Sequence, residues 1–194
     1  MQYLKDEIKS RIISAALKEI YDKGFLDASM RRIAKDAGIA IGNVYRYFKS
    51  KEDLFYEIVN PAYYSLINFT GNHNYTSTSN TPVFKAVVDK IMPIFREYRV
   101  QLLLLMDKSK GTKYENIKDK LILIIVKDIN DYLLPNIKKR GVDIKDSYIF
   151  DVIAATFLEA LFIILRKYSD EDAIRYLVYE LLSISFSDID KRFV

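Results

Sequence analysis

The chain has no cysteine, no tryptophan and one histidine, and only six glycines and four prolines among its 194 residues. The absence of cysteine excludes disulfides and thiolate metal sites, and a cytoplasmic location is the simplest expectation. So few glycines and prolines argue against a sheet-rich fold with many tight turns. The first residues, "MQYLKDEIKSR", lack the apolar core of a signal peptide, and the most apolar runs, 102–106 and 121–126, are too short to span a bilayer. We expect no membrane partner.

Recognisable catalytic machinery is also missing. The one histidine, His73, lies in the polar stretch 70–81, whose composition predicts a loop or linker. There is no Gly-x-Ser-x-Gly elbow, no phosphate-binding glycine loop and no His-rich metal spacing. We therefore expect no enzyme activity, no cofactor and no metal site. Catalysis by carboxylates alone stays open, without positive support.

Positive charge is concentrated at the start of the chain. Residues 1–51 hold eleven Lys and Arg against six acidic residues, whereas the other 143 residues are close to neutral. Such an asymmetry indicates a nucleic acid or an anionic membrane surface as the partner of the basic segment, although a basic face is often simply solvated.

Apolar residues recur with helical spacing along nearly the whole chain, and no alternating strand pattern is present. The sequence predicts an all-α fold with a small basic head, residues 1–50, and a larger apolar body, residues 51–194. Ser29 and Ser50 are predicted N-caps, a capping box at 112–115 is expected to start the helix from 113, and Ser169 is expected to precede the last helix. Pro61 is expected to bend or end its helix. The predicted helices are 6–23, 29–37, 40–47, 51–61, 82–98, 100–109, 113–139, 146–167 and 170–187.

Residues 29–48 predict two helices joined by a tight turn at Gly38. Ala34 is small enough to let the two helices cross closely, and glycine supplies the unusual backbone conformation of the turn. This arrangement describes a helix-turn-helix, whose second helix enters the major groove of DNA. The apolar residues expected to point inward are Ile33, Ala37, Ile39, Val44 and Phe48.

The segment "GFLDASMRRIAKDAGIAIGNVYRYFKSKEDLF" (24–55) closely resembles the DNA-binding signature of the tetracycline-repressor (TetR) family of bacterial transcription regulators. The matching elements are Gly24-Phe25, Ser29, "IAKDAGI" and "GNVYRYFKSKEDLF". The signature covers about a quarter of the chain. The resemblance implies a DNA-binding head followed by a helical body that binds a small effector and dimerises.

Several residues of the signature have chemistry suited to DNA, although Tyr45 and Tyr47 can also be ordinary half-buried aromatics and the lysines a solvated face. Asn43 can read adenine through two hydrogen bonds, and Arg46 can read guanine or hold a phosphate. Tyr45 and Tyr47 resemble the family's aromatics that grip the backbone. Ile41 replaces the lysine of many members, so it can pack on a thymine methyl but cannot donate to guanine. The expected DNA-binding residues are Ser29, Ile41, Gly42, Asn43, Tyr45, Arg46, Tyr47, Lys49 and Lys51.

One short recognition helix reaches too few base pairs to select one genomic site, which predicts a homodimer on a near-palindromic operator. Helices 148–165 and 173–186 are apolar on two sides, so they can be central in the protomer or form a dimer face. The resemblance favours a four-helix interface. The expected interface residues are Phe150, Ile153, Phe157, Leu161, Ile164, Tyr176 and Tyr179.

The resemblance also implies an effector pocket in the body, for an aromatic or hydrophobic small molecule. Core packing is the competing role of each candidate, and Glu159 can equally belong to a solvated stripe. The candidates are Tyr63, Tyr64, Phe69, Phe95, Tyr98, Met106 and Glu159. The resemblance thus implies a DNA-binding transcriptional regulator, with repression as the expected mode and release by the effector. The alternative is a helical DNA-associated or partner-binding protein without an effector.

Overall fold

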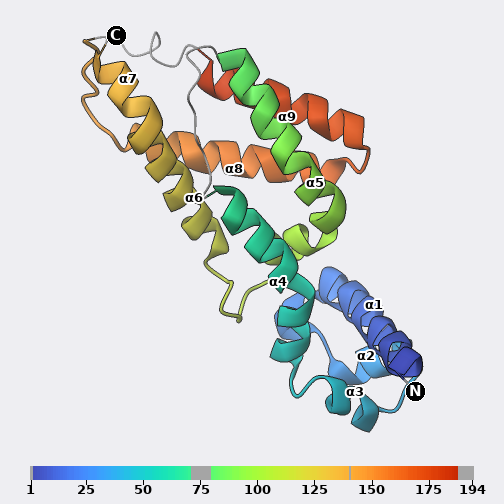
Figure 1. The fold of residues 1–194 in the computed structure, drawn as a ribbon. Helices are drawn as coiled ribbons and strands as arrows, with labels where there is room; N and C mark the ends of the chain where they lie inside the picture. The colour runs from blue at the N-terminus through green and yellow to red at the C-terminus, as the bar shows by residue number, and fades with distance from the viewer. Residues whose placement is uncertain (1, 71–79, 140, 188–194) are drawn as a thin grey trace. The chain divides into compact units, whose positions relative to one another are not determined.

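The computed structural model describes residues 2–70, 80–139 and 141–187, and every regular element in these ranges is a helix (Figure 1). The expected all-α fold is confirmed. Over the same ranges, each helix is too short or too polar to cross a membrane. His73 and most of the predicted loop 70–81 lie outside the described residues. The elements are α1 (Gln2–Asp27), α2 (Met30–Asp36), α3 (Ile41–Tyr47), α4 (Lys51–Thr70), α5 (Asn80–Asp107), α6 (Ile117–Asp128), the π-helical turn η1 (Ile129–Leu133), α7 (Leu134–Lys139), α8 (Ile149–Lys167) and α9 (Glu171–Phe186).

The chain divides into two compact units. Unit 1 comprises Met1–Tyr64 and Val100–Asn116, and unit 2 comprises Ser65–Arg99 and Ile117–Val194. Unit 1 is therefore larger than the head predicted at residues 1–50. Most of α4, as far as Tyr64, belongs to it, and so does the later segment Val100–Asn116.

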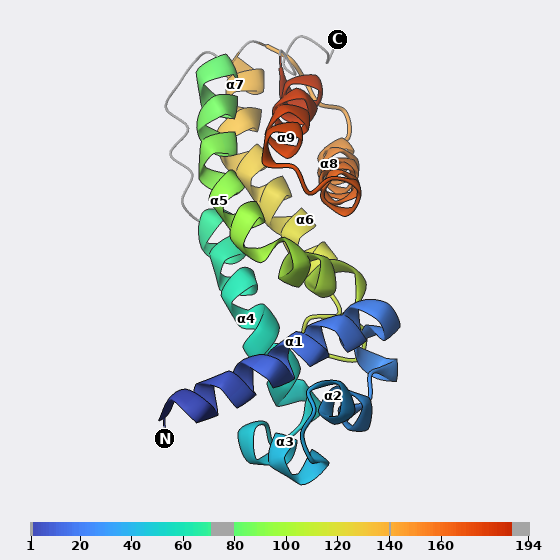
Figure 2. The same cartoon turned by 90° about the vertical axis from the view of Figure 1, so that its right-hand side faces the viewer.

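The core of unit 1 is built from the apolar stripe of α1 and the start of α4. Ile12, Ala16 and Ile20 are fully buried at helical spacing, and Leu54 and Phe55 of α4 are equally buried. Figure 2 shows α1 lying across α2, with α3 beyond α2. This packing holds two very short helices, α2 and α3, on one long one.

The segment Val100–Asn116 completes unit 1. The backbone N–H of Phe25 donates to the carbonyl of Lys108 at 3.0 Å. Tyr114 is buried and stacks edge-on against Tyr56 of α4, with ring centroids 5.7 Å apart. The ammonium of Lys113 lies 4.1 Å from the centroid of the Tyr56 ring, a cation–π contact. This packing explains why the segment belongs with the amino-terminal helices.

The capping box predicted at 112–115 is not a helix start. Residues 109–116 form turns, and α6 begins only at Ile117. Thr112 is buried, and its hydroxyl donates to the carbonyl of Ser109 at 2.7 Å, while the Glu115 carboxylate accepts from the N–H of Gly111 at 3.1 Å. The side chains that resemble a capping box therefore stabilise a compact loop.

Other helix bounds differ from the prediction at residues with special backbones. α4 continues through Pro61 to Thr70, so this proline does not end the helix. The predicted helices 82–98 and 100–109 form one element, α5, which begins at Asn80 and has a non-helical residue at Tyr98. Ser169 precedes the last helix as expected, and the N-cap is Asp170, whose side chain accepts from the N–H of Ala173 at 2.8 Å. The Ser50 cap is present: its Oγ accepts from the N–H of Asp53 at 3.0 Å.

In unit 2, α8 packs on α6 and on α9. The buried stripe of α8 is formed by Phe150, Ala154, Leu158, Phe162 and Leu165. Phe150 is wholly buried against Ile129 and Ile137 of the same chain. Phe150 is therefore part of the protomer core, and this corrects its expected place on a dimer face.

The other residues expected at a dimer face are more accessible. Ile153, Phe157, Leu161, Ile164 and Tyr179 are half-buried, and Tyr176 is 63% exposed. Apart from Tyr176, the most exposed apolar residues of α8 and α9 are different from the expected interface residues. They are Ile149, Val152, Ile163, Tyr176 and Ile184, which are 38–68% exposed.

Candidate nucleic-acid interface

A tight turn joins α2 to α3. Gly38 has φ of 67°, a left-handed conformation that favours glycine, and the N–H of Ile39 donates to the carbonyl of Ala34 at 3.0 Å. Ala34 is 3% exposed, as expected of a small residue where two helices cross. These features form the helix-turn-helix that the sequence predicts.

The outward side of α3 is polar and aromatic. Val44 is the one residue of α3 that is buried, and Phe48 directly after it is 5% exposed. The opposite side, which we name the recognition face, is exposed to solvent. Its residues are Ile41, Gly42, Asn43, Tyr45 and Arg46. A Cβ added at Gly42 would meet no atom within 4 Å, so the backbone itself is open to an approaching surface there.

Next to the recognition face lies a hollow of about 520 Å³. Its residues come from the starts of α2 and α4 and from α3. Of its four charged residues, three are cations and one is a carboxylate. The lining is Ala28, Ser29, Met30, Arg31, Tyr45, Lys49, Ser50, Lys51 and Glu52. The hollow thus brings together four residues expected to bind DNA: Ser29, Tyr45, Lys49 and Lys51. Arg31 of α2 lines it as well.

The two lysines in this hollow differ in their surroundings. Lys49 is exposed. Lys51 is half-buried, and its ammonium donates to the carbonyls of Leu26 and Ala28 at 2.9 and 3.0 Å. It also lies 4.6 Å from the centroid of the Phe25 ring. Lys51 therefore binds the end of α1, a structural role that the sequence did not suggest.

Ser29 is the N-cap of α2, but its side chain makes no capping hydrogen bond. The backbone N–H of Ser29 donates to Oε1 of Glu19 in α1 at 3.0 Å. The same oxygen accepts a second hydrogen bond from Nε of Arg32 at 2.6 Å. Burial raises the pKa of Glu19, but the hydrogen bonds from Arg32 and Ser29 outweigh it and hold the pKa below its ordinary value. Glu19 was missed as a functional candidate, although a carboxylate on the apolar stripe of α1 is a visible signal.

The expected effector residues fall in both units. Tyr63, Tyr64 and Met106 belong to unit 1, where Tyr63 stacks on Tyr114 with centroids 4.7 Å apart, Tyr64 is 55% exposed and Met106 is buried. Phe69, Phe95, Tyr98 and Glu159 belong to unit 2, where Phe95 is 1% exposed. Glu159 is exposed and pairs with Arg166 at 2.8 Å and Lys118 at 3.5 Å, which matches its reading as part of a solvated stripe.

No group of three or more His, Asp or Glu side chains gathers as a metal site within residues 2–70, 80–139 and 141–187. The recognition face and the adjacent hollow present hydrogen-bond donors, cations and an aromatic ring beside the carboxylate of Glu52. This set suits phosphates and base edges.

Residues 12–58 match the family described as bacterial regulatory proteins, tetR family. An HTH-type transcriptional regulator of Staphylococcus aureus (strain USA300) is 43% identical over 53 residues, which are 27% of this chain and 29% of that protein. The chain thus aligns with less than a third of the length of this curated relative.

Two solved structures share the fold of nearly the whole chain. A TetR-family regulator from Streptomyces coelicolor A3 has a TM-score of 0.66 at 16% identity, over 92% of this chain and 90% of that one. A transcriptional regulator from Aquifex aeolicus VF5 has a TM-score of 0.62 at 15% identity, over 92% and 99%. The matched family and these proteins are regulators and not enzymes. Residues 12–58 thus carry the signature of the tetR family of bacterial regulatory proteins, and nearly the whole chain shares the all-helical fold of the two solved regulators.

Proposed function

We propose that this protein regulates transcription by placing the recognition face of α3 in the major groove of DNA. The observation that carries the proposal is the exposure of Asn43, Tyr45 and Arg46 beside a hollow that holds Arg31, Lys49 and Lys51. Amide and guanidinium groups read base edges, and the cations of the hollow neutralise phosphates. Such a regulator acts in the bacterial cytoplasm, where the chromosome lies.

Selection of bound duplexes from a random pool tests this function directly. We expect a two-fold symmetric consensus, because a homodimer presents two copies of α3 to half-sites about one helical turn apart. Affinity for the selected operator should fall steeply with salt, by about 0.9 logarithmic units per phosphate contact for each tenfold rise in salt. Failure to enrich any sequence, or an affinity that ignores salt, would contradict the proposal.

Lys49 and Lys51 provide a matched pair of substitutions. Lys49→Ala should weaken DNA binding several-fold and reduce the salt slope by about one, without changing the melting temperature, because Lys49 is exposed. Lys51→Ala should lower the melting temperature as well, since it leaves the carbonyls of Leu26 and Ala28 without their ammonium donor. Fluorescence anisotropy and thermal denaturation measure the two effects. Equal melting temperatures for the two variants would refute the structural role of Lys51.

We propose that α8 and α9 form the face of a homodimer. The support comes from the exposed apolar residues of these helices, such as Ile163 and Tyr176, which are 55% and 63% exposed in the protomer. The half-buried residues Ile153, Phe157, Leu161, Ile164 and Tyr179 lie on the same two helices. Burying such a face is favourable by about 25 cal/mol per Å² of apolar surface.

Ile163→Glu should convert the dimer to a monomer at micromolar concentration, because a carboxylate would be buried in an apolar interface. The matched control is Leu123→Glu on α6, where the native side chain is 66% exposed. That substitution should leave the oligomer unchanged. Sedimentation velocity distinguishes the species. If the parent protein sediments as a monomer, the dimer proposal is wrong.

We further propose that a small aromatic or hydrophobic molecule, bound in the helical body, releases the protein from its operator, so that the protein acts as a repressor. The support is the resemblance to the family together with the aromatic side chains Phe69, Phe95 and Tyr98 of unit 2. A hundredfold loss of DNA affinity requires about 2.7 kcal/mol of differential binding. No covalent cofactor is needed for this.

A panel of metabolites and drugs, screened by thermal denaturation, tests the effector. A true effector should raise the melting temperature of the free protein and displace labelled operator over the same concentration range, because it binds one state of the protein better than the other. Compounds that stabilise the protein without displacing DNA serve as the control. If every stabilising compound leaves the operator bound, the protein is a DNA-associated regulator without a releasing ligand.

A further inference from the structure

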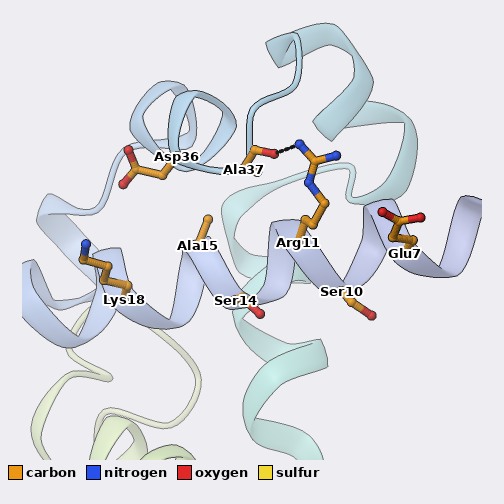
Figure 3. A pocket seen from close by; sticks show the side chains of 8 residues that line it. All are labelled: Glu7, Ser10, Arg11, Ser14, Ala15, Lys18, Asp36 and Ala37. Carbon is orange, nitrogen blue, oxygen red and sulfur yellow. Dashed lines mark hydrogen bonds between the residues drawn. The ribbon is translucent and has the colours of Figure 1, made fainter.

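Two oppositely charged residues of α1 contact the two ends of α2. From the first half of α1, Nη2 of Arg11 donates to the carbonyl of Ala37, the C-cap of α2, and lies 3.3 Å from the carbonyl of Gly38. Eight residues later, Glu19 accepts from the N–H of Ser29, the N-cap of α2. Figure 3 shows Arg11 reaching from α1 to Ala37.

The distance along α1 from Arg11 to Glu19 is similar to the length of α2, whose two ends these residues contact. Eight residues of α1 advance by about 12 Å, and the seven residues of α2 span about 10.5 Å. The earlier residue of α1 contacts the later end of α2, so the two hydrogen bonds hold opposite ends of α2. Any slide of α2 along α1 would therefore break a hydrogen bond at one end or the other.

The charges also suit the ends that they contact. The N-terminal end of a helix is partially positive and the C-terminal end partially negative, so a carboxylate favours the first and a guanidinium the second. Glu19 is 7% exposed, and the hydrogen bonds that it accepts from Ser29 and Arg32 keep it ionised. A buried carboxylate held in this way fixes a single position for its partners.

The turn that follows α2 is shaped around Arg11. A Cβ added at Gly38 would lie 2.7 Å from Nη2 of Arg11, closer than Cβ atoms normally approach other heavy atoms, so the guanidinium would have to shift. Gly38 is thus suited to this position by its φ of 67° and by the guanidinium beside it. The same turn sets the direction in which α3 begins.

We propose that Arg11 and Glu19 are positioning residues that fix α2 along α1 and thereby place the recognition face of α3 on DNA. This inference rests on the proposed DNA-binding function. It assigns no DNA contact to either side chain. Contacts to base edges need α3 at a fixed place, whereas attraction to phosphates does not. Loss of the pair should therefore reduce sequence discrimination more than general affinity for DNA.

The test compares affinities for the selected operator and for a scrambled duplex of equal length. Arg11→Met should lower the ratio of the two affinities about tenfold, the effect expected of one lost hydrogen bond to a charged group. Lys18→Met is the matched control, because it removes one positive charge from the exposed surface of α1 two turns away. It should lower both affinities alike and leave the ratio unchanged.

Two conservative variants separate positioning from stability. Arg11→Lys, which can donate to the same carbonyls, should keep the ratio within about threefold of the parent. Glu19→Gln keeps an acceptor oxygen but loses the charge, and should lower the ratio by an intermediate amount. All assays are run well below the melting temperature of each variant, and these two variants decide the matter if Arg11→Met does not fold.

The possible outcomes are distinguishable. An unchanged ratio in Arg11→Met, with affinities lowered as in Lys18→Met, would overturn the positioning role and leave the proposed function intact. If Arg11→Met does not fold, an unchanged ratio in Glu19→Gln overturns it in the same way. A parent protein that binds the operator and the scrambled duplex equally would overturn the proposed function and this inference together.

Discussion

The recognition helix α3 cannot hold its own position. A helix of seven residues is far too short to be stable in water, and of the residues of α3 only Val44 is buried. Its place is set by Val44, by Phe48 at its end and by the turn at Gly38. The accuracy with which this protein can meet a DNA groove therefore depends on tertiary contacts of α3 and not on the helix itself.

The same reasoning explains the arrangement of charge around α2 and α3. Arg11, Arg32, Arg46 and Lys49 are all exposed and Lys51 is half-buried, but Arg11, Arg32 and Lys51 also bind carbonyls or a carboxylate of the protein. Some basic residues in this part of the chain thus hold the protein's own structure together, and others remain available to a partner. Net charge alone cannot tell them apart, because both kinds contribute equally to it.

Sequence patterns correctly predicted those features of the fold that depend on residues close together in the chain. Helical spacing identified most of the helices, and the small residue Ala34 followed by Gly38 identified the turn. The prediction failed where a distant residue decides the outcome: Glu19 bonds to Ser29 ten residues away, and Lys51 to Leu26. It also failed at 112–115, where a Thr and a Glu with the spacing of a helix cap stabilise a loop instead. Phe150 was misplaced because several stripes of α8 are apolar and only packing shows which one is buried.

The contribution of Val100–Asn116 to unit 1 bears on how this protein can be taken apart or recombined. Residues 1–50 expressed alone would lack Phe55, Tyr56 and Tyr114, and would leave the apolar surface beneath them open to water. Such a fragment is expected to aggregate. A chimaera that transfers the whole of unit 1 to another protein has to graft two separate stretches of chain, and a sequence alignment of the amino-terminal signature alone would supply only one of them.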